Sequence, residues 1–200
     1  MKNLIYILIF IFNVNTLLAQ LNPEPKKITK RFFIDDETVK EVTPTLQKKR
    51  GFTDYQELIS FLEIQQQKHP ELVELKYIGK SQKGYDIPII YISNDNYDTD
   101  NKVKVWYQGA LHGNEMATAD SMMYIIYKML NDDSLSYLLE KIDLAIVPMA
   151  NIDGFLKVDR YSDNGIDLNR DQTKLMAPES VILKNTFNEF KPQVALDFHE

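Results

Sequence analysis

Apolar residues between positions 53 and 70 recur every three or four residues, which is the spacing of one helix face. They are Tyr55, Leu58, Ile59 and Leu62. Thr53 and Gln56, three residues apart at the start of this segment, match a capping box. A helix is therefore predicted to run to about His69, where Pro70 ends it.

Two apolar runs follow this helix. Residues 73–77 alternate apolar with charged side chains and predict a half-buried strand. Residues 87–92 form a second run, and a turn around Gly84 makes an antiparallel pairing the simplest arrangement of the two. The polar residues 94–101 are predicted to form a loop.

The rest of the chain alternates strand and helix patterns. The predicted order is strand, helix, strand, helix, strand over residues 103–109, 116–130, 143–148, 179–190 and 194–198. This order is typical of α/β folds, in which helices cover the sheet. A methionine-rich apolar stripe along residues 119–130 is expected to pack in the core.

The first fifty residues differ in composition from the rest. Residues 1–19 contain one basic and no acidic residue around the apolar run 4–12, a pattern typical of a signal peptide. The run is shorter than the roughly 20 residues that span a bilayer, so a permanent membrane helix is the weaker alternative. Residues 20–50 carry eight basic and five acidic side chains and three prolines, and we interpret them as a linker or pro-like arm.

Charge and cysteine content exclude several functions. The chain has 23 basic and 29 acidic side chains, a formal net charge of −6 that makes nucleic acid a poor partner. Residues 51–200 carry −10, because the arm is positive. The absence of cysteine excludes disulfides, thiolate zinc ligands and a cysteine nucleophile.

Two of the three histidines follow predicted strands. His112 comes soon after the strand that ends near position 109, and His199 directly after the strand that ends near position 198. Ligands of open α/β sheets bind beyond the carboxyl ends of strands, so both imidazoles are expected in one crevice. With Glu115 they could supply the three ligands of a catalytic zinc site, whereas His69 has no expected chemical role. Taken alone, the His-x-x-Glu spacing also fits a helix N-terminus with Glu115 facing the helix dipole.

Polar residues downstream extend this hypothesis. A metal-bound histidine donates its second ring proton to a carboxylate, for which Asp167 is the candidate and Asp197 the second choice. Asn169 and Arg170 are candidates for anchoring a substrate carboxylate, because a guanidinium binds carboxylates through two parallel hydrogen bonds. A turn at 164–165 with Arg170 as a surface cation is the alternative.

Several segments together resemble the zinc carboxypeptidase family related to carboxypeptidase A. The similar segments are His112-Gly-Asn-Glu115, Asn151-Ile-Asp-Gly-Phe155, Asp167-Leu-Asn-Arg170 and Asp197-Phe-His199. Residues 55–81 also resemble the opening helix and strand of the family. The resemblance spans about residues 51–200, the N-terminal part of a catalytic domain. It implies an α/β fold with a mixed, mostly parallel sheet flanked by helices.

The resemblance also implies roles for individual residues. Three would bind one zinc ion, one would orient the first ligand and two would hold the C-terminal carboxylate of a peptide: His112, Glu115 and His199, then Asp167, then Asn169 and Arg170. An arginine that stabilises the oxyanion is implied as well. Arg160 is the candidate, although a plain surface arginine fits its neighbourhood equally well.

By the same resemblance, the general base is a glutamate well downstream of the third ligand, and is expected beyond residue 200. Glu200 itself follows a ligand on the same strand end and is expected to point away from it. The chain is therefore expected to stop before the C-terminal third of the domain.

The function implied by the resemblance is a secreted or periplasmic zinc metallocarboxypeptidase that acts on peptides with a free C-terminal carboxylate. It is expected to act away from the membrane once the signal peptide is removed. The alternatives are a zinc amidase for cell-wall peptides or acylated amino acids, and an inactive fragment or binding module.

Overall fold

The computed structural model describes residues 25–32, 42–95 and 101–200. Contacts divide the chain into two units, one up to Lys40 and the other from Glu41 onwards. In the first unit the described residues include the short helix α2 (Lys26–Phe32). The predicted signal peptide, residues 1–19, lies outside the described residues. None of the helices in the described ranges is long and apolar enough to cross a bilayer.

The second unit contains a five-stranded sheet with the strand order β1-β2-β4-β3-β5. The strand bounds are Val73–Lys80 (β1), Asp86–Ile92 (β2), Val103–Gly109 (β3), Ile142–Val147 (β4) and Val194–Phe198 (β5). β2 pairs antiparallel with β1 and β4, whereas β3 pairs parallel with β4 and β5. All strands except β2 therefore point the same way, which confirms the mixed, mostly parallel sheet.

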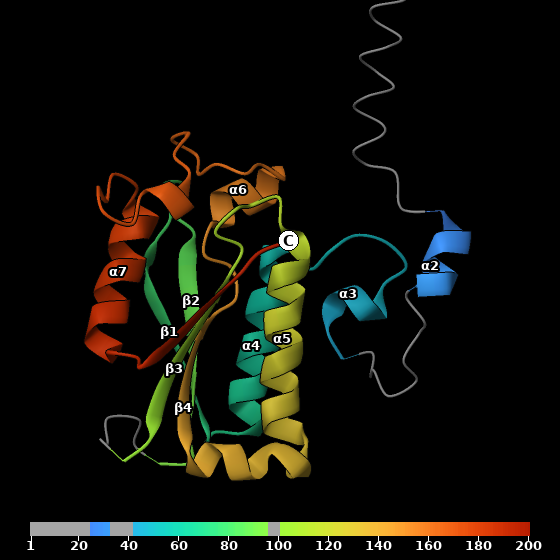
Figure 1. Cartoon of the computed structure of the whole chain (residues 1–200), viewed down its shortest axis with the longest axis vertical. Coiled ribbons are helices and arrows are strands. Elements are labelled where there is room, and N and C mark those ends of the chain that lie inside the picture. Colours follow the sequence, from blue (N-terminus) through green and yellow to red (C-terminus); the bar gives the residue numbers. More distant parts are fainter. Residues whose placement is uncertain (1–24, 33–41, 96–100) are drawn as a thin grey trace, which may run out of the picture. The chain divides into compact units, whose positions relative to one another are not determined.

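Helices cover both faces of this sheet (Figure 1). α4 (Tyr55–Lys68) and α5 (Met116–Asn131) lie on one side, and α7 (Pro178–Phe190) lies on the other. The central strands β2 and β4 are buried along almost their whole length because they are covered from both sides. Each fully buried Ile or Leu in such a strand contributes roughly 1.5–3 kcal/mol to stability.

The core contains the side chains that the apolar pattern predicts. Trp106 on β3 is 1% exposed, and its ring centre lies 5.5 Å from that of Phe187 on α7 in an edge-to-face arrangement. Met122, Met123 and Ile126 of α5 are completely buried. The methionine-rich stripe of α5 is therefore part of the core, as predicted.

The start of α4 differs from the prediction by one residue. Asp54 and Glu57 form the capping box: the Asp54 carboxylate accepts the amide of Glu57 (2.9 Å), and the Glu57 carboxylate accepts the amide of Asp54 (2.8 Å). The predicted pair, Thr53 and Gln56, does not form it. The Thr53 hydroxyl instead donates to Asp120 of α5 (2.5 Å).

Residues 42–50, which we assigned to the arm, make hydrogen bonds to the rest of this unit. They include the short helix α3 (Pro44–Gln47). The Thr45 hydroxyl donates to the second carboxylate oxygen of Asp120 (2.8 Å), and Lys48 Nζ lies 2.5 Å from the Glu57 carboxylate. Asp120 thus accepts from both Thr45 and Thr53, and it fixes the segment before α4 to the side of α5.

The structure also contains short elements that the apolar pattern does not predict. They are the 3₁₀ helix η1 (Asp133–Glu140), the helix α6 (Ile152–Lys157) and the 3₁₀ helix η2 (Leu168–Arg170). α6 and η2 have too few residues for a helical period to be visible in the sequence. η2 contains the two residues that the sequence assigned to carboxylate binding, Asn169 and Arg170.

Candidate metal centre

The predicted metal ligands lie at the edge of the sheet where β3 and β5 end. β3 ends at Gly109, and Ala110 has a left-handed φ of 54°, which turns the chain out of the strand direction. The amide of Ala110 donates to the Thr118 hydroxyl (2.8 Å), which in turn donates to the carbonyl oxygen of Glu115 (2.6 Å). These two bonds fix the loop between Ala110 and Glu115 against the first turn of α5.

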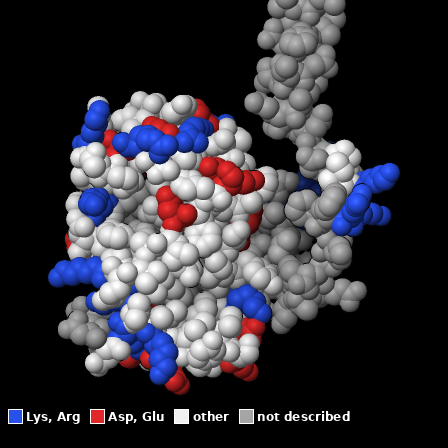
Figure 2. Space-filling view, in the orientation of Figure 1, with Lys and Arg blue, Asp and Glu red and all other residues white. Residues whose placement is uncertain are grey.

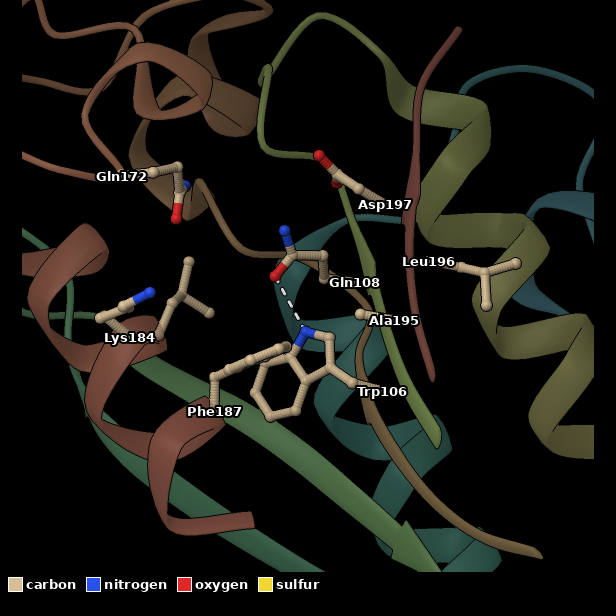
Figure 3. Close-up of a pocket in the computed structure, with 9 residues that line it drawn as sticks. Trp106, Gln108, Gln172, Lys184, Phe187, Ala195, Leu196 and Asp197 are labelled. Carbon is tan, nitrogen blue, oxygen red and sulfur yellow. Dashed lines mark hydrogen bonds between the residues drawn. The ribbon is translucent and has the colours of Figure 1, made fainter. Parts of the chain in front are cut away.

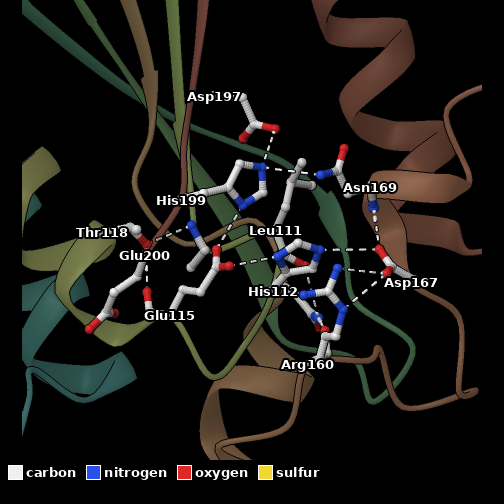
Figure 4. A network of polar contacts seen from close by, with 12 residues as sticks. Leu111, His112, Glu115, Thr118, Arg160, Asp167, Asn169, Asp197, His199 and Glu200 are labelled. Atoms are coloured by element: carbon white, nitrogen blue, oxygen red, sulfur yellow. Dashed lines mark hydrogen bonds and ion pairs between the residues drawn. The ribbon is translucent and has the colours of Figure 1, made fainter.

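His112, Glu115 and His199 converge at this edge (Figure 4). Nδ1 of His112 lies 2.8 Å from one Glu115 carboxylate oxygen, and Nδ1 of His199 lies 2.8 Å from the other. The centres of the two imidazole rings are 4.7 Å apart. One ligand atom from each of the three residues lies within 4.8 Å of the others. The structure therefore brings together the three residues proposed from the sequence.

Each imidazole turns its other nitrogen toward an aspartate. Nε2 of His112 lies 3.2 Å from Asp167 Oδ1, and Nε2 of His199 lies 2.9 Å from Asp197 Oδ2. The sequence offered Asp167 as the first candidate for a partner of this kind and Asp197, two residues before His199, as the second. In the structure the two aspartates contact one histidine each.

Burial and hydrogen bonding act in opposite directions on the charges of this cluster. Burial raises the pKa of Glu115, but hydrogen bonds from His112 and His199 outweigh it and hold that pKa below its usual range. Burial lowers the pKa of His199, but Glu115 and Asp197 outweigh it and raise that pKa. Burial raises the pKa of Asp197. The Glu115 carboxylate is thus held in its ionised form, which is the form that binds metals.

The Asp167 carboxylate also contacts Arg160. Asp167 Oδ2 accepts from Nε (3.1 Å) and Nη2 (3.0 Å) of Arg160, while Oδ1 accepts the amide of Asn169 (3.0 Å). Burial raises the pKa of Asp167, but the Arg160 guanidinium outweighs it and lowers that pKa. Arg160 therefore lies beside the ligand cluster, bound to the same aspartate as His112.

Asn169 and Arg170 lie next to the cluster on η2. Asn169 Nδ2 is 3.2 Å from His199 Nε2. The exposed Arg170 side chain donates through Nη1 to the carbonyl oxygen of Asn169 (3.2 Å). Figure 2 shows basic and acidic side chains interspersed on one face, with basic ones at its upper, left and lower parts and acidic ones near the middle and along the lower edge. Because charges of both signs share this face, recognition of an anion there depends on individual side chains.

Glu200 points away from the ligand cluster, as its position next to His199 predicts (Figure 4). Its Oε2 accepts the amide of Ala117 in the first turn of α5 (3.2 Å). The carboxylate therefore binds a helix end, where the helix dipole favours negative charge.

A hollow of about 160 Å³ lies beside the cluster, lined by residues of β3, β5 and α7 and by Gln172 of the segment between η2 and α7 (Figure 3). Trp106 and Phe187 are among its apolar lining residues, and Trp106 Nε1 donates to the side-chain oxygen of Gln108 (2.9 Å). Asp197 lines the same hollow and contacts His199. One carboxylate thus connects this hollow with the ligand cluster.

Two buried residues that hold the site were not assigned these roles from the sequence. Thr118 links Ala110 to Glu115, and Asn151 donates through Nδ2 to the carbonyl oxygen of Leu111 (3.2 Å). Asn151 belongs to a segment that carries the family resemblance, but the sequence of that segment does not indicate which atoms Asn151 binds. Both side chains bind backbone atoms, and such partners leave no signature in the spacing of residue types.

The donor set fits a zinc ion. Two imidazole nitrogens and one carboxylate oxygen are the protein ligands of a class of catalytic zinc sites. In this chain His112 and His199 present Nδ1 to the shared carboxylate and Nε2 to an aspartate. Outer carboxylates of this kind orient metal-bound imidazoles in zinc proteins.

The fold and the site together define an α/β protein with a candidate metal centre beyond the carboxyl ends of parallel strands. A sequence model described as "Zinc carboxypeptidase" matches residues 58–193. The chain belongs to the zinc carboxypeptidase family.

Individual relatives agree with this assignment. Carboxypeptidase 2 of Trichophyton rubrum is 36% identical over 126 residues, which cover 60% of this chain and 23% of that protein. Carboxypeptidase B of Helicoverpa zea is 28% identical over 125 residues, covering 61% and 29%. The crystal structure of carboxypeptidase A from Helicoverpa armigera matches with a TM-score of 0.69 and 26% identity, covering 74% of this chain and 46% of that one. The chain spans about a quarter of the length of these curated relatives.

Proposed function

We propose that this protein is a secreted or periplasmic zinc-dependent carboxypeptidase that removes C-terminal residues from peptides by hydrolysis. The proposal is carried by the cluster of His112, Glu115 and His199, in which an aspartate contacts each histidine. Membership of the family supports zinc as the ion. The relatives are named as carboxypeptidases and do not favour the amidase or binding-module alternatives.

Zn²⁺ bound at such a cluster supplies a Lewis acid that polarises a carbonyl group and activates a water molecule. The protein's own part is to hold the ligands in position. Glu115 contributes a carboxylate whose lowered pKa keeps it ionised. Asp167 and Asp197 hold the imidazoles with Nδ1 toward the cluster.

Arg160 is proposed to stabilise the negative charge that develops on the substrate carbonyl oxygen. Its guanidinium is placed beside the cluster by Asp167, and its side chain is 39% exposed, so part of it is open to a bound substrate. A preorganised donor at such a position typically changes the rate by about 10²–10³.

Arg170 and Asn169 are proposed to bind the C-terminal carboxylate of the peptide. The Arg170 guanidinium is exposed, and Asn169 contacts His199, so the pair lies between solvent and the cluster. A planar guanidinium can bind both oxygens of a carboxylate at once. On this proposal the pair gives the protein a preference for peptides with a free C-terminus.

Export is proposed from residues 1–19, whose pattern is that of a signal peptide. The test is to fuse residues 1–19 to a reporter enzyme and to measure the reporter outside the cytoplasm. A second fusion, with charged residues placed in the apolar run 4–12, should keep the reporter inside. Equal distribution of the two reporters would contradict export by this segment.

The metal site is tested by measuring bound zinc in purified protein. We expect His112→Ala and His199→Ala to lose stoichiometric zinc, because each removes one of three ligands. His69→Ala is the matched control, since His69 ends α4 and is not part of the cluster. Retention of stoichiometric zinc by either ligand variant would show that the assignment is wrong.

The reaction is tested with a pair of peptides that differ at one end only. The free-acid peptide should lose its C-terminal residue, whereas the amidated peptide should be cleaved far more slowly. Equal cleavage of the two would contradict the role of Arg170. Cleavage of muropeptides in preference to the free-acid peptide would favour the cell-wall amidase instead.

A further inference from the structure

Asn151, the residue before α6, is completely buried, and both polar atoms of its side chain are bonded. Its Oδ1 accepts the amide of Gly154 (3.0 Å), which caps α6. Its Nδ2 donates to the carbonyl oxygens of Leu111 (3.2 Å) and Arg160 (3.4 Å). One side chain therefore joins the loop before His112, the start of α6 and the segment that carries Arg160.

These contacts form a closed ring that passes through the proposed site. Leu111 precedes His112, whose Nε2 lies 3.2 Å from Asp167 Oδ1. The other oxygen of Asp167 accepts the Arg160 guanidinium (3.0 Å). The carbonyl oxygen of Arg160 accepts a hydrogen bond from Asn151, which closes the ring. A shift at Asn151 is thus transmitted to His112 and Arg160, which both contact Asp167.

We propose that Asn151 is a positioning residue, which sets the place of the His112 imidazole relative to the Arg160 guanidinium. The inference rests on the proposed function, because it assigns Asn151 a role in that same site. Asn151 acts through the backbone of Leu111 and Arg160 rather than by contact with the ion or the substrate.

The loop and α6 are packed too closely for the loop to move independently of the helix. A Cβ atom at Gly113 would lie 2.1 Å from the backbone carbon of Gly154 and 2.2 Å from the nitrogen of Phe155. The backbone amide of Asn151 also donates to the carbonyl oxygen of Ala110 (3.0 Å). A displaced start of α6 would therefore also displace the loop between Ala110 and Glu115.

The position requires a carboxamide. Two carbonyl oxygens need a donor, and the Gly154 amide needs an acceptor, which an asparagine side chain provides together. Serine can still cap a helix through its oxygen, but its single hydroxyl hydrogen cannot serve both carbonyl groups. Asn151→Ser therefore separates capping from bridging.

The test compares Asn151→Ser with Asp54→Ser in the full-length protein. Both changes put a serine at a helix N-cap, but Asp54 caps α4 and does not contact the ring described above. Zinc affinity is measured by competition with a chelator, and the visible absorption of the Co²⁺-substituted protein reports ligand geometry. Urea unfolding shows that each variant is folded and records its stability.

We expect Asn151→Ser to weaken zinc binding about ten-fold and to shift the Co²⁺ spectrum. This is the lower end of the 10–100-fold effect of groups that hydrogen-bond a metal ligand directly, because Asn151 acts one step further from the ligands. Asp54→Ser should have the same zinc affinity and the same Co²⁺ spectrum as the parent. Parental affinity and spectrum in Asn151→Ser would overturn the inference, and so would equal weakening in Asp54→Ser.

His112→Ala, measured alongside, separates this inference from the proposed function. If His112→Ala keeps parental zinc affinity, the metal site itself is wrong and the inference falls with it. If His112→Ala loses zinc while Asn151→Ser binds it normally, only the positioning role is wrong.

Discussion

Nε2 of His112 lies 3.2 Å from Oδ1 of Asp167, on the other side of the imidazole from Glu115. This contact selects which ring nitrogen faces the ligand cluster, because an imidazole held by an aspartate at one nitrogen presents the other to a metal. The second oxygen of Asp167 binds Arg160. Asp167 therefore fixes a proposed ligand and a proposed catalytic arginine in one arrangement.

Asp167→Asn is predicted to weaken zinc binding about ten-fold. Asparagine keeps the shape of the side chain but removes the negative charge that faces both His112 and Arg160. The affinity is measured by competition with a chelator. Asp163→Asn is the control, because Asp163 pairs with Lys83 (3.2 Å) rather than with the cluster. Equal zinc affinities of the two variants would show that Asp167 does not support the site.

Arg170→Lys is predicted to raise KM for a free-acid peptide about ten-fold and to change kcat less. Lysine keeps the positive charge but cannot form two parallel hydrogen bonds to a carboxylate. The measurement is a steady-state comparison on free-acid peptides, with the exposed Arg50→Lys as control. A fall in kcat with unchanged KM would place Arg170 in another role.

The sequence was sufficient to bring the candidate metal ligands together because one rule connects strand order with position. Residues that follow parallel strands meet at the same edge of the sheet, and β3 and β5 are parallel neighbours. That rule brings His112 and His199 together even though they are far apart in the chain. The sequence also offered Asp197 as an aspartate partner, and alternation along β5 puts it on the same side as His199.

Long-range polar contacts were beyond the reach of the local pattern. Thr53 with Gln56 and Asp54 with Glu57 are adjacent matches to a capping box, and the local sequence does not decide between them. Asp120 decides between them, because its carboxylate, 67 residues further along the chain, accepts a hydrogen bond from the Thr53 hydroxyl. The hydrogen bonds of Asn151 could not be predicted from the sequence for a similar reason, since its partners are backbone carbonyl groups of separate segments.

Gly113→Ala is predicted to reduce the free energy of unfolding by about 3 kcal/mol, at the upper end of the usual effect of overpacking. The added methyl group would lie 2.1 Å from the backbone of Gly154, and a backbone contact cannot be relieved by a change of rotamer. Urea unfolding measures the effect.

Gly84→Ala is the control for this prediction. Gly84 has a φ of +89° and has no neighbouring atom within 4 Å of the Cβ position, so its replacement adds backbone strain alone, about 1–2 kcal/mol. A Gly113→Ala protein as stable as Gly84→Ala would mean that the loop between Ala110 and Glu115 can separate from α6 without loss of stability.

Glu179 is a completely buried carboxyl group in the first turn of α7. Its Oε1 accepts the amide of Gln82 (2.8 Å), and its Oε2 has no hydrogen-bond partner among the described residues. Burial raises the pKa of Glu179, and the nearby charge of Asp153 raises it further. The N-terminus of a helix favours negative charge, but the direction of the pKa shift shows that burial prevails here.

Glu179→Gln is predicted to stabilise the protein at neutral pH. The folded state holds the Glu179 proton more tightly than the unfolded chain, so stability is lost as pH rises from the ordinary value of 4.5 through the raised value in the fold. Glutamine does not ionise, so it avoids this loss of stability, and its side-chain oxygen can still accept the amide of Gln82. The free energies of unfolding of variant and parent should therefore agree at about pH 4, and the variant should be more stable by about 1 kcal/mol at about pH 7.

Urea unfolding across this pH range measures the difference. The control is Glu189→Gln, an exposed position on the same helix, which should stay within about 0.5 kcal/mol of the parent. A variant less stable than the parent at neutral pH would mean that the attraction of the helix N-terminus for the ionised carboxylate exceeds the effect of burial.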